Sequence, residues 1–396
     1  MRHSDTRTSV DYSHRTKLQR PLTIMSRQST IASRLRKNGV HLVDARQLYV
    51  DDDVPLDHIY PGATLYPGVR LHGADTVIGP NARIGSEGPA TLINVAVGSN
   101  AEIASGFVTG SAILANARLG PNSHVRSGSL IEEAASTAHA VGLKHTILMS
   151  FVTLGSLINL CDALVAGGRS QHEHSEIGSG FVHFNFAPWG PRGDKATPSL
   201  FGDVTEGVFL DNDRLFIGGL AGIVGPRRLD YGSMVAPGSI LRKNLASGAF
   251  ASAPPHAVEH SIDLNSPRYS KQKVEENIAY ISQLFALYNW YVHVRARFST
   301  YQSDDLSLHL LTERAIAVLL SGLGERVKRL NDYLVGNDKK PIAFKFTDVP
   351  PRFDFDGMAR HTQFVAWVKS LASTERQDLR TWLLDCVDHI AGGIEA

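Results

Sequence analysis

An aliphatic residue recurs at steps of six, or twelve where one position is skipped, through much of residues 78–241, and no other feature of the sequence restricts the fold as strongly. Five consecutive hits fall at 217–241. A period of six matches neither the helical period of about 3.6 nor the alternation of an ordinary strand. The steps hold within five groups: Ile78 and Ile84; Val97 and Ile103; Ile113, Leu119, Val125 and Ile131; Val141, Ile147, Val165 and Ile177, with Thr153 and Asn159 in step; and Ile217, Ile223, Leu229, Val235 and Leu241.

A six-residue unit supplies one short strand and one corner, so three units complete one turn of a triangular β-helix. The aliphatic side chain of each unit then points inward and stacks on its counterparts in the turns above and below. A β-sandwich would show alternation and a variable spacing of roughly 8–12 residues between turns. The sequence therefore predicts a mainly β protein with a parallel β-helix over residues 54–250.

Different patterns flank this repeat. Residues 1–28 are rich in Arg, Ser and Thr without an apolar core, which predicts a disordered tail, with a transit peptide as the alternative and Met25 as another start. Residues 29–53 predict a short helix and a lead-in. Residues 266–396 show helical periodicity and predict a mostly α-helical C-terminal domain with its own core.

The charge balance, the apolar runs and the cysteine count restrict the partners and the location that we expect for the protein. Forty basic and 39 acidic residues leave little net charge, so we expect no nucleic-acid partner. No apolar run approaches the roughly 18 residues of a membrane span, so we expect no membrane partner. Cys161 and Cys386 are the only cysteines, which predicts a reducing, cytoplasmic location and no disulfide framework.

A block of polar and aromatic residues at 186–200 interrupts the repeat. A β-helix accepts insertions at its corners, and a long loop is usually functional. The segment 179–203 around it holds three prolines and four glycines, which predicts a shaped loop. The loop offers stacking and phosphate-binding side chains, so we expect it to close over a sugar phosphate or a nucleotide sugar through Asn185, Trp189, Arg192, Asp194, Lys195 and Thr197.

Two segments carry a resemblance to a known family. "NGVHLVDARQLYVDDDV" (38–54) and "ARLGPNSHVRSGSLIEEAASTAHAVGLKH" (117–145) resemble the acetyltransferase half of the bifunctional N-acetylglucosamine-1-phosphate uridylyltransferase/glucosamine-1-phosphate acetyltransferases. The resemblance covers roughly residues 38–245. It implies a left-handed β-helix, a homotrimer, acetyl-CoA as donor, and sugar-phosphate binding by Arg126 and Lys144. Asn185, Phe186 in place of the family's Tyr, and Lys195 would complete the acceptor pocket.

The whole chain is also similar to stand-alone proteins labelled UDP-N-acetylglucosamine pyrophosphorylases. That reaction needs a nucleotide-binding α/β domain with a Gly-rich loop. The sequence has no such loop, and the residues before the repeat are too few for such a domain. We therefore do not expect uridylyl transfer.

The catalytic base of the acetyltransferases has no direct counterpart. Their histidine precedes the Asn-Tyr loop, whereas "GSLINLCDALVAGG" (155–168) supplies Asn159 and Asp162 at that place. Histidine is suited to deprotonating an amine near neutral pH, so His174 is the first candidate base and Asp162 the second. The candidates expected to converge on one groove, between neighbouring subunits, are Arg126, Lys144, Asn159, Asp162, His172, His174 and His183.

The leading hypothesis is therefore an acyltransferase-like protein for a phosphorylated or nucleotide-linked amino sugar. A non-catalytic sugar-nucleotide-binding or scaffold protein is the alternative, because the base is displaced. A metal-dependent enzyme at the subunit interface is a weaker third hypothesis, since His172 and His174 could share zinc with His183. The characteristic His spacing of such enzymes is missing, so no metal is expected.

Overall fold

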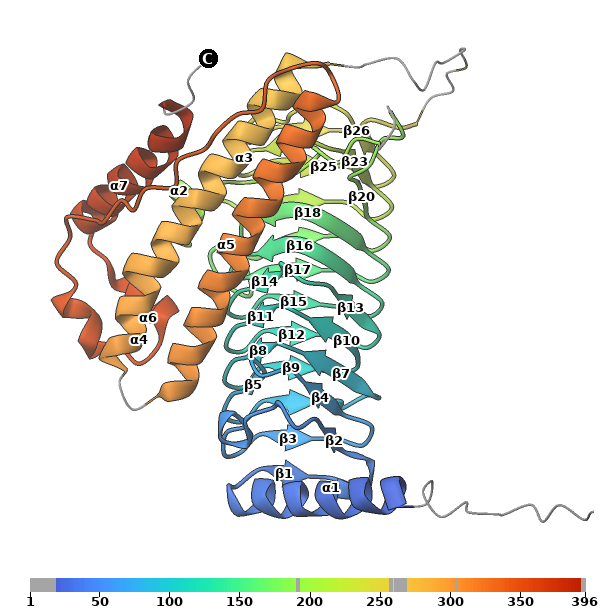
Figure 1. Cartoon of the computed structure of the whole chain (residues 1–396). Coiled ribbons are helices and arrows are strands. Elements are labelled where there is room, and N and C mark those ends of the chain that lie inside the picture. The colour runs from blue at the N-terminus through green and yellow to red at the C-terminus, as the bar shows by residue number, and fades with distance from the viewer. Residues whose placement is uncertain (1–18, 190–192, 256–258, 260–268, 303–304, 393–396) are drawn as a thin grey trace, which may run out of the picture.

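The computed structural model describes residues 19–189, 193–255, 259, 269–302 and 305–392, with side chains placed for residues 27–390 of these. The chain folds into a left-handed parallel β-helix with a helical region along one side (Figure 1), as the sequence predicts. The strand pairs of the β-helix are parallel and join each turn to the next.

The β-helix is a prism with three faces, here named A, B and C. Face A is an 11-stranded sheet with one strand from each turn. Its strands are β1 (His41–Leu42), β3 (Thr64–Leu65), β6 (Arg83–Ile84), β9 (Glu102–Ile103), β12 (Arg118–Leu119), β15 (Ser136–Thr137), β17 (Val152–Leu154), β19 (Ser175–Ile177), β22 (Phe216–Ile217), β25 (Met234–Val235) and β27 (Phe250–Ala251).

Faces B and C form one 16-stranded sheet, because β16 (Gly142–Leu148) and β18 (Asn159–Val165) run through both. Face B also holds β2 (Tyr49–Val50), β4 (Arg70–His72), β7 (Ala90–Ile93), β10 (Gly106–Thr109), β13 (Ser123–Val125), β20 (Val182–Phe184), β23 (Gly222–Val224) and β26 (Ile240–Leu241). Face C also holds β5 (Val77–Ile78), β8 (Ala96–Val97), β11 (Ala112–Ile113), β14 (Leu130–Ile131), β21 (Ser199–Phe201) and β24 (Arg228–Leu229).

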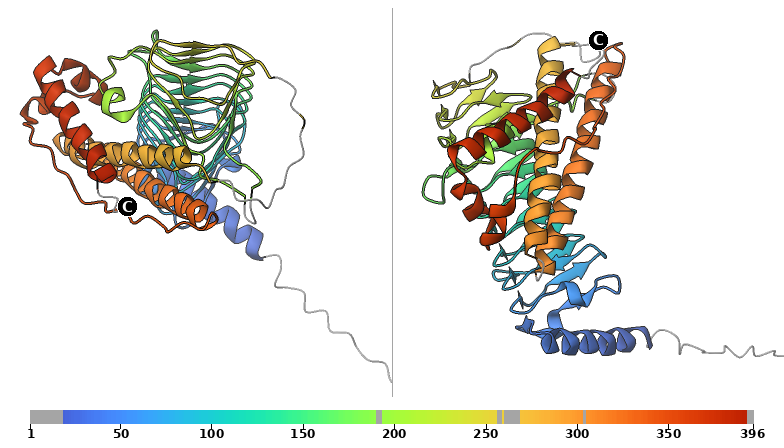
Figure 2. Two further views of the ribbon diagram at one scale, coloured as in Figure 1. Left: turned by 90° about the horizontal axis from the view of Figure 1, so that it is seen from above. Right: turned by 90° about the vertical axis from the view of Figure 1, so that its left-hand side faces the viewer.

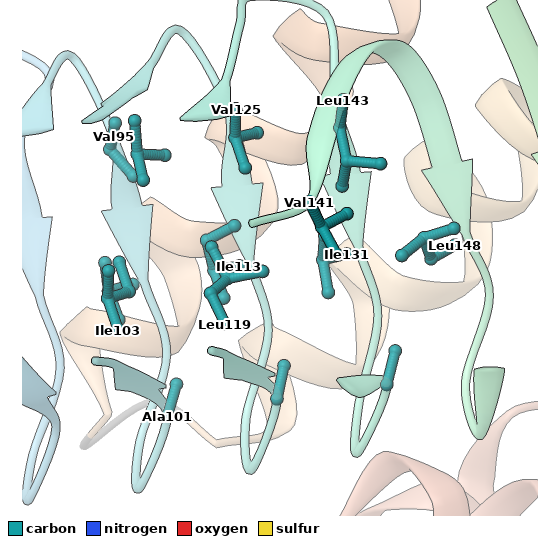
Figure 3. Packing of buried hydrophobic residues seen from close by; sticks show 14 of the residues in the cluster. Val95, Ala101, Ile103, Ile113, Leu119, Val125, Ile131, Val141, Leu143 and Leu148 are labelled. Carbon is teal, nitrogen blue, oxygen red and sulfur yellow. The ribbon is translucent and has the colours of Figure 1, made fainter. Parts of the chain in front are cut away.

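The inward stack keeps a step of six over stretches of the chain such as residues 113–143, and other turns have corners that are longer or shorter. Ile113, Leu119, Val125 and Ile131 point into the core, as Figure 3 shows. The next corner has one residue fewer, so the step from Leu143 to Leu148 is five. Ile147 therefore faces outward, and the expectation that Ile147, Thr153 and Asn159 continue the stack is wrong. Leu148, Leu154 and Leu160 hold these core positions instead.

The helix α1 (Gln19–Lys37) covers the first turn of the β-helix (Figure 1). Leu35 is fully buried in the inner core. The Gln28 side chain bonds both backbone groups of Val50 in β2, donating to its carbonyl at 2.9 Å and accepting from its N–H at 3.1 Å. The helix begins ten residues earlier than expected, and β1 and β2 already form the first turn, so the β-helix starts before residue 54.

In the described part of the chain, the C-terminal helices lie along face C and not along face A or face B (Figure 2). The helix α3 (Lys271–Asn289) continues through a π-helical turn, η3 (Trp290–Arg295), into α4 (Ala296–Tyr301). An antiparallel helix, α5 (Leu306–Val335), packs beside it. The remaining helical elements are α2 (Val204–Gly207), α6 (Phe364–Ser370), α7 (Ser373–Gly392) and the short 3-10 turns η1 (Ala45–Gln47), η2 (Leu56–His58) and η4 (Asp356–Arg360).

The helical region does not have a core of its own, contrary to expectation. Its buried Leu284, Trp290 and Leu319 belong to one cluster with the outward side chains of face C. The face C members include Ala96, Ala112, Leu130, Ile147 and Leu164. The β-helix and the helices thus share one apolar interface, which both would expose to water if they separated.

The long helix α5 runs unbroken through Gly322 and Gly324. By length and composition it is also the one helix in the described part of the chain that could cross a membrane. In the structure α5 packs along face C.

A buried charge cluster ties η3 to the β-helix. The Arg295 guanidinium contacts Glu133 at 2.5 and 2.9 Å and lies 3.5 Å from Glu132. The Tyr291 hydroxyl donates to Glu132 at 2.7 Å, and the Ser150 N–H donates to the same carboxylate at 3.1 Å. Burial raises the pKa of Glu132; it also acts on Glu133, where the charge and hydrogen bonds of Arg295 outweigh it and lower the pKa.

Candidate functional site

The corner between faces B and C, here called the B–C corner, brings several of the predicted residues together. Arg126 directly follows β13, and Lys144 and Cys161 lie in β16 and β18 of the next two turns, where they are in register with each other. The Arg126 guanidinium lies 3.6 Å from Cys161 Sγ, and the thiol lies 3.5 Å from Asn159 Oδ1. Neither Arg126 nor Lys144 has a carboxylate within ion-pair distance among the described residues. We name Arg126, Lys144, Asn159 and Cys161 the basic patch.

The Cys161 thiol lies outside the aliphatic stack. Cys161 is 4% exposed yet belongs to neither hydrophobic cluster. Burial raises the pKa of the thiol, and the Asp162 charge adds to that rise. The sulfur therefore fills the floor of the basic patch as a neutral group.

Asp162 holds the corner together. It is the residue that bends β18 from face B to face C, with φ at 58°. Its carboxylate accepts from Arg326 of α5 at 2.8 Å and from the Asn185 amide at 2.7 Å, and both Asp162 and Arg326 are buried. The neighbouring His145 has its pKa lowered, by burial first and then by Arg326. Because both Asp162 oxygens are engaged, its observed role is to join α5, the insert and the β-helix.

The insert leaves the same corner and is an ordered loop over its described residues. Ala187 and Asp194 form an antiparallel bridge. The Asp194 carboxylate pairs with Lys273 of α3, and the Asn277 amide donates to the Ala196 carbonyl at 3.0 Å. Thr197 is buried and donates to the Asn185 carbonyl at 2.7 Å. Thr197 thus stabilises the loop, whereas Lys195 is exposed above the Phe186 ring. Arg192 lies outside the described residues.

A pocket of about 640 Å³ opens between the insert, the next turn of the β-helix and the ends of α3 and α5. This volume lies within the range of about 300–1,000 Å³ typical of small-molecule sites. Its lining residues are Phe184, Phe186, Ala187, Trp189, Gly193, Asp194, Lys195, Thr197, Val224, Gly225, Pro226, Arg227, Ser270, Gln272, Lys273, Arg329, Asn331, Asp332, Tyr333, Val335, Gly336 and Asn337.

His183 points into the prism and not into a groove. It replaces an aliphatic residue in the inner stack, in register with Ile223. Its Nδ1 lies 2.5 Å from the Cys161 carbonyl and its Nε2 2.8 Å from Ser199 Oγ. Burial lowers the pKa of His183. The ring is therefore a buried hydrogen-bonding member of the core, and it cannot reach a ligand or join a zinc site with His172 and His174.

His172 and His174 lie at a different corner, between faces C and A, in the loop from β18 to β19. His174 Nδ1 lies 2.8 Å from the Gln171 carbonyl, and its Nε2 lies 3.4 Å from Glu176. His172 lines a second hollow of about 660 Å³ together with Asn100, Asn116 and Arg118. Within one chain, therefore, the two histidines do not converge with the basic patch.

No group of three or more His, Cys, Asp or Glu residues is arranged to hold a metal ion in the described part of the chain.

The sequence analysis missed the contribution of the helical region and of Arg227. Lys273, Arg329 and Tyr333 line the pocket from α3 and α5, more than 70 residues after the insert. The only available signal was the pair Arg227–Arg228, where the resumed repeat places two cations directly after "GP".

The comparisons with known proteins agree with a hexapeptide-repeat protein. No family model matches the chain. The bifunctional protein GlmU of Nocardia farcinica (strain IFM 10152) is 28% identical over 242 residues, which are 60% of this chain and 43% of that protein. This chain thus spans less than half of its relative.

Two solved structures also align with most of the chain. They are a UDP-N-acetylglucosamine acyltransferase from Campylobacter jejuni (14% identity, 69% of this chain and 93% of that one) and the O-acyltransferase LpxA from Moraxella catarrhalis RH4 (15% identity, 72% and 95%). Both have a TM-score of 0.21, and at that score neither bears on what this chain does.

Proposed function

We propose that the B–C corner binds a phosphorylated or nucleotide-linked amino sugar and that the protein transfers an acyl group to it from acetyl-CoA or a related thioester. The observation that carries the proposal is the basic patch, in which successive turns present Arg126 and Lys144 without carboxylate partners in the described chain, next to the pocket beneath the insert. Arginine grips a phosphate through two N–H groups, and lysine adds a point charge. The similarity to GlmU also supports this proposed function.

Replacing Arg126 or Lys144 with Ala should weaken binding of glucosamine 1-phosphate by about 1.5–3 kcal/mol each, because a charge-assisted hydrogen bond is lost. Isothermal titration calorimetry on the full chain measures this change. The matched control is Arg70→Ala, which removes an exposed arginine from the same face, several turns away. Equal losses in Arg70→Ala and Arg126→Ala would contradict a defined phosphate site.

A non-catalytic binding protein is the second candidate, and one observation favours it. Asp162 is engaged by Arg326 and Asn185, and His174 lies at another corner, so neither candidate base faces the basic patch within one chain. An amine acceptor must lose a proton to react with a thioester. A coupled assay for thiol release, with acetyl-CoA and amino-sugar phosphates, separates the two candidates.

We further propose a homotrimer, in which face A or face B of one copy meets its neighbour and brings that copy's His174 to the basic patch. The helices cover face C alone, which leaves the other two faces for subunit contacts, and closed symmetry is the usual form of such assemblies. Light scattering should give three times the chain mass of 43.1 kDa. A stable monomer at micromolar concentration would remove His174 as the base. A cytoplasmic location remains a proposal, supported by two free cysteines.

A further inference from the structure

The pocket beneath the insert contains a cation, Arg227, that has no ion-pair partner among the described residues. Arg227 is half-buried, and its Nε is buried without a hydrogen-bond partner. One Nη donates to the adjacent Pro226 carbonyl. No carboxylate of the described residues lies within ion-pair distance of Arg227, and Glu276 acts on it only from farther away. Burial lowers the pKa of this guanidinium, so a bound anion would relieve a desolvated charge.

The other charges of the pocket largely cancel. Asp194 pairs with Lys273, and Asp332 lies 4.0 Å from Arg329. Lys195, on the insert, makes no ion pair in the part of the chain that the structure describes, and its Nζ lies 5.9 Å from the centre of the Phe186 ring. Arg227 and Lys195 therefore leave the pocket with an excess of positive charge on two of its walls.

Flat apolar surfaces stand beside these cations. The Phe184 and Phe186 side chains are 43% and 52% exposed, although both line the pocket. On the helical wall, the Asn337 Oδ1 is buried without a donor. Exposed aromatic faces next to unpaired cations suit a ligand that combines a planar ring with a polyanion.

We infer that this pocket binds a nucleoside diphosphate, with the diphosphate at Arg227 and Lys195 and the base against Phe184 and Phe186. The inference deepens the proposed function and rests on it, because it identifies the part of the substrates that the helical region helps to hold. Two substrates of the proposed reaction carry this chemistry: a nucleotide sugar, and the nucleotide end of coenzyme A.

The register of the face B strands also indicates how a bound ligand would be oriented. Asn159 of the basic patch pairs with Val182, two residues before Phe184 of the pocket, so the patch and the pocket lie on adjacent turns of face B. Strands of adjacent turns are about 4.8 Å apart. A ligand with its nucleotide at Phe184 can therefore extend its other end along face B toward Lys144 and Arg126.

Calorimetry with UDP, UDP-N-acetylglucosamine and coenzyme A tests the inference on the full chain. We expect the parent protein to bind UDP-N-acetylglucosamine or coenzyme A, and Arg227→Ala to weaken whichever binds by about 10- to 100-fold. Arg228→Ala is the matched control, since Arg228 is the next residue, is exposed, and pairs with Asp230 at 2.6 Å outside the pocket. It should change affinity by less than about twofold. Binding of UDP alone indicates the sugar-nucleotide source, and competition by coenzyme A alone indicates the thioester source.

Two results would overturn the inference: no binding of any of these nucleotides at millimolar concentration, or equal affinities for Arg227→Ala and the parent. Other results would contradict the proposed function without contradicting this inference, or the reverse. If glucosamine 1-phosphate still binds and depends on Arg126 while no nucleotide binds, only the nucleotide pocket is lost. If nucleotides bind through Arg227 but no acyl group is transferred, the inference is supported and the proposed acyltransferase activity is contradicted.

Discussion

Replacing Arg295 with Met should lower the free energy of unfolding by about 3–5 kcal/mol, because it leaves Glu132 and Glu133 buried without their cation. Both carboxylates belong to the β-helix, and Arg295 comes from the helical region. Tyr291 and Ser150 can satisfy some of the oxygens but cannot supply positive charge. The attachment of the helices to face C should therefore weaken first.

The two parts of the chain can be followed separately in this variant. Three of the four tryptophans, Trp290, Trp367 and Trp382, lie in the helical region, so their fluorescence reports its docking. In Arg295→Met, we expect the fluorescence transition in guanidinium chloride to precede the circular dichroism transition of the β-helix. Arg297→Met is the control, because Arg297 is exposed on the same helical segment and makes no ion pair within the described chain. Coincident transitions at unchanged denaturant concentration in Arg295→Met would contradict the role of this cluster.

The second large effect concerns Arg326. Arg326→Met should also lower the free energy of unfolding by about 3–5 kcal/mol, because Asp162 would keep a buried negative charge with only the Asn185 amide as partner. The double variant Arg326→Met/Asp162→Asn should recover most of this loss, since it removes both charges together. Equilibrium unfolding of the parent, both single variants and the double variant completes a double-mutant cycle.

The cycle distinguishes a true pair from two independent sites. A coupling energy near zero would mean that Asp162 and Arg326 act separately. If the pair instead has the expected strength, the single variant Arg326→Met should also weaken binding of glucosamine 1-phosphate, because Asp162 positions Asn185, the residue directly before the insert. A ligand affinity unchanged by Arg326→Met would show that the insert does not depend on this corner.

The sequence was sufficient to predict the β-helix because inward positions depend on local residue type alone. Ile217 through Leu241 meet the same requirement five times, and the structure buries all of them. Counting in steps of six wrongly placed Ile147 in the inner stack, because the corner before it is shorter by one residue and shifts the register. Such a shift is a property of the backbone at His145, whose φ is 47°, and periodicity cannot reveal it.

The docking of the helices was predictable in principle. An apolar residue immediately precedes the inward one on face C, as in Ala112–Ile113, Leu130–Ile131 and Leu164–Val165. Paired apolar residues on a strand mean that both of its surfaces are buried. The candidate site was harder to predict, because its residues are joined by ion pairs such as Asp162–Arg326 across more than 160 positions of sequence.

Gln28 has a consequence for the behaviour of the protein in concentrated solution. The terminal turn of a β-helix offers free backbone donors and acceptors to any extended chain, and this is how fibrils recruit new members. Gln28 already occupies the N–H and the carbonyl of Val50, in the place where the next strand of face B would lie. Leu35, on the same helix, fills the end of the core. At this end, the Gln28 amide imitates a peptide group and stands where a strand of another chain would have to pair with Val50.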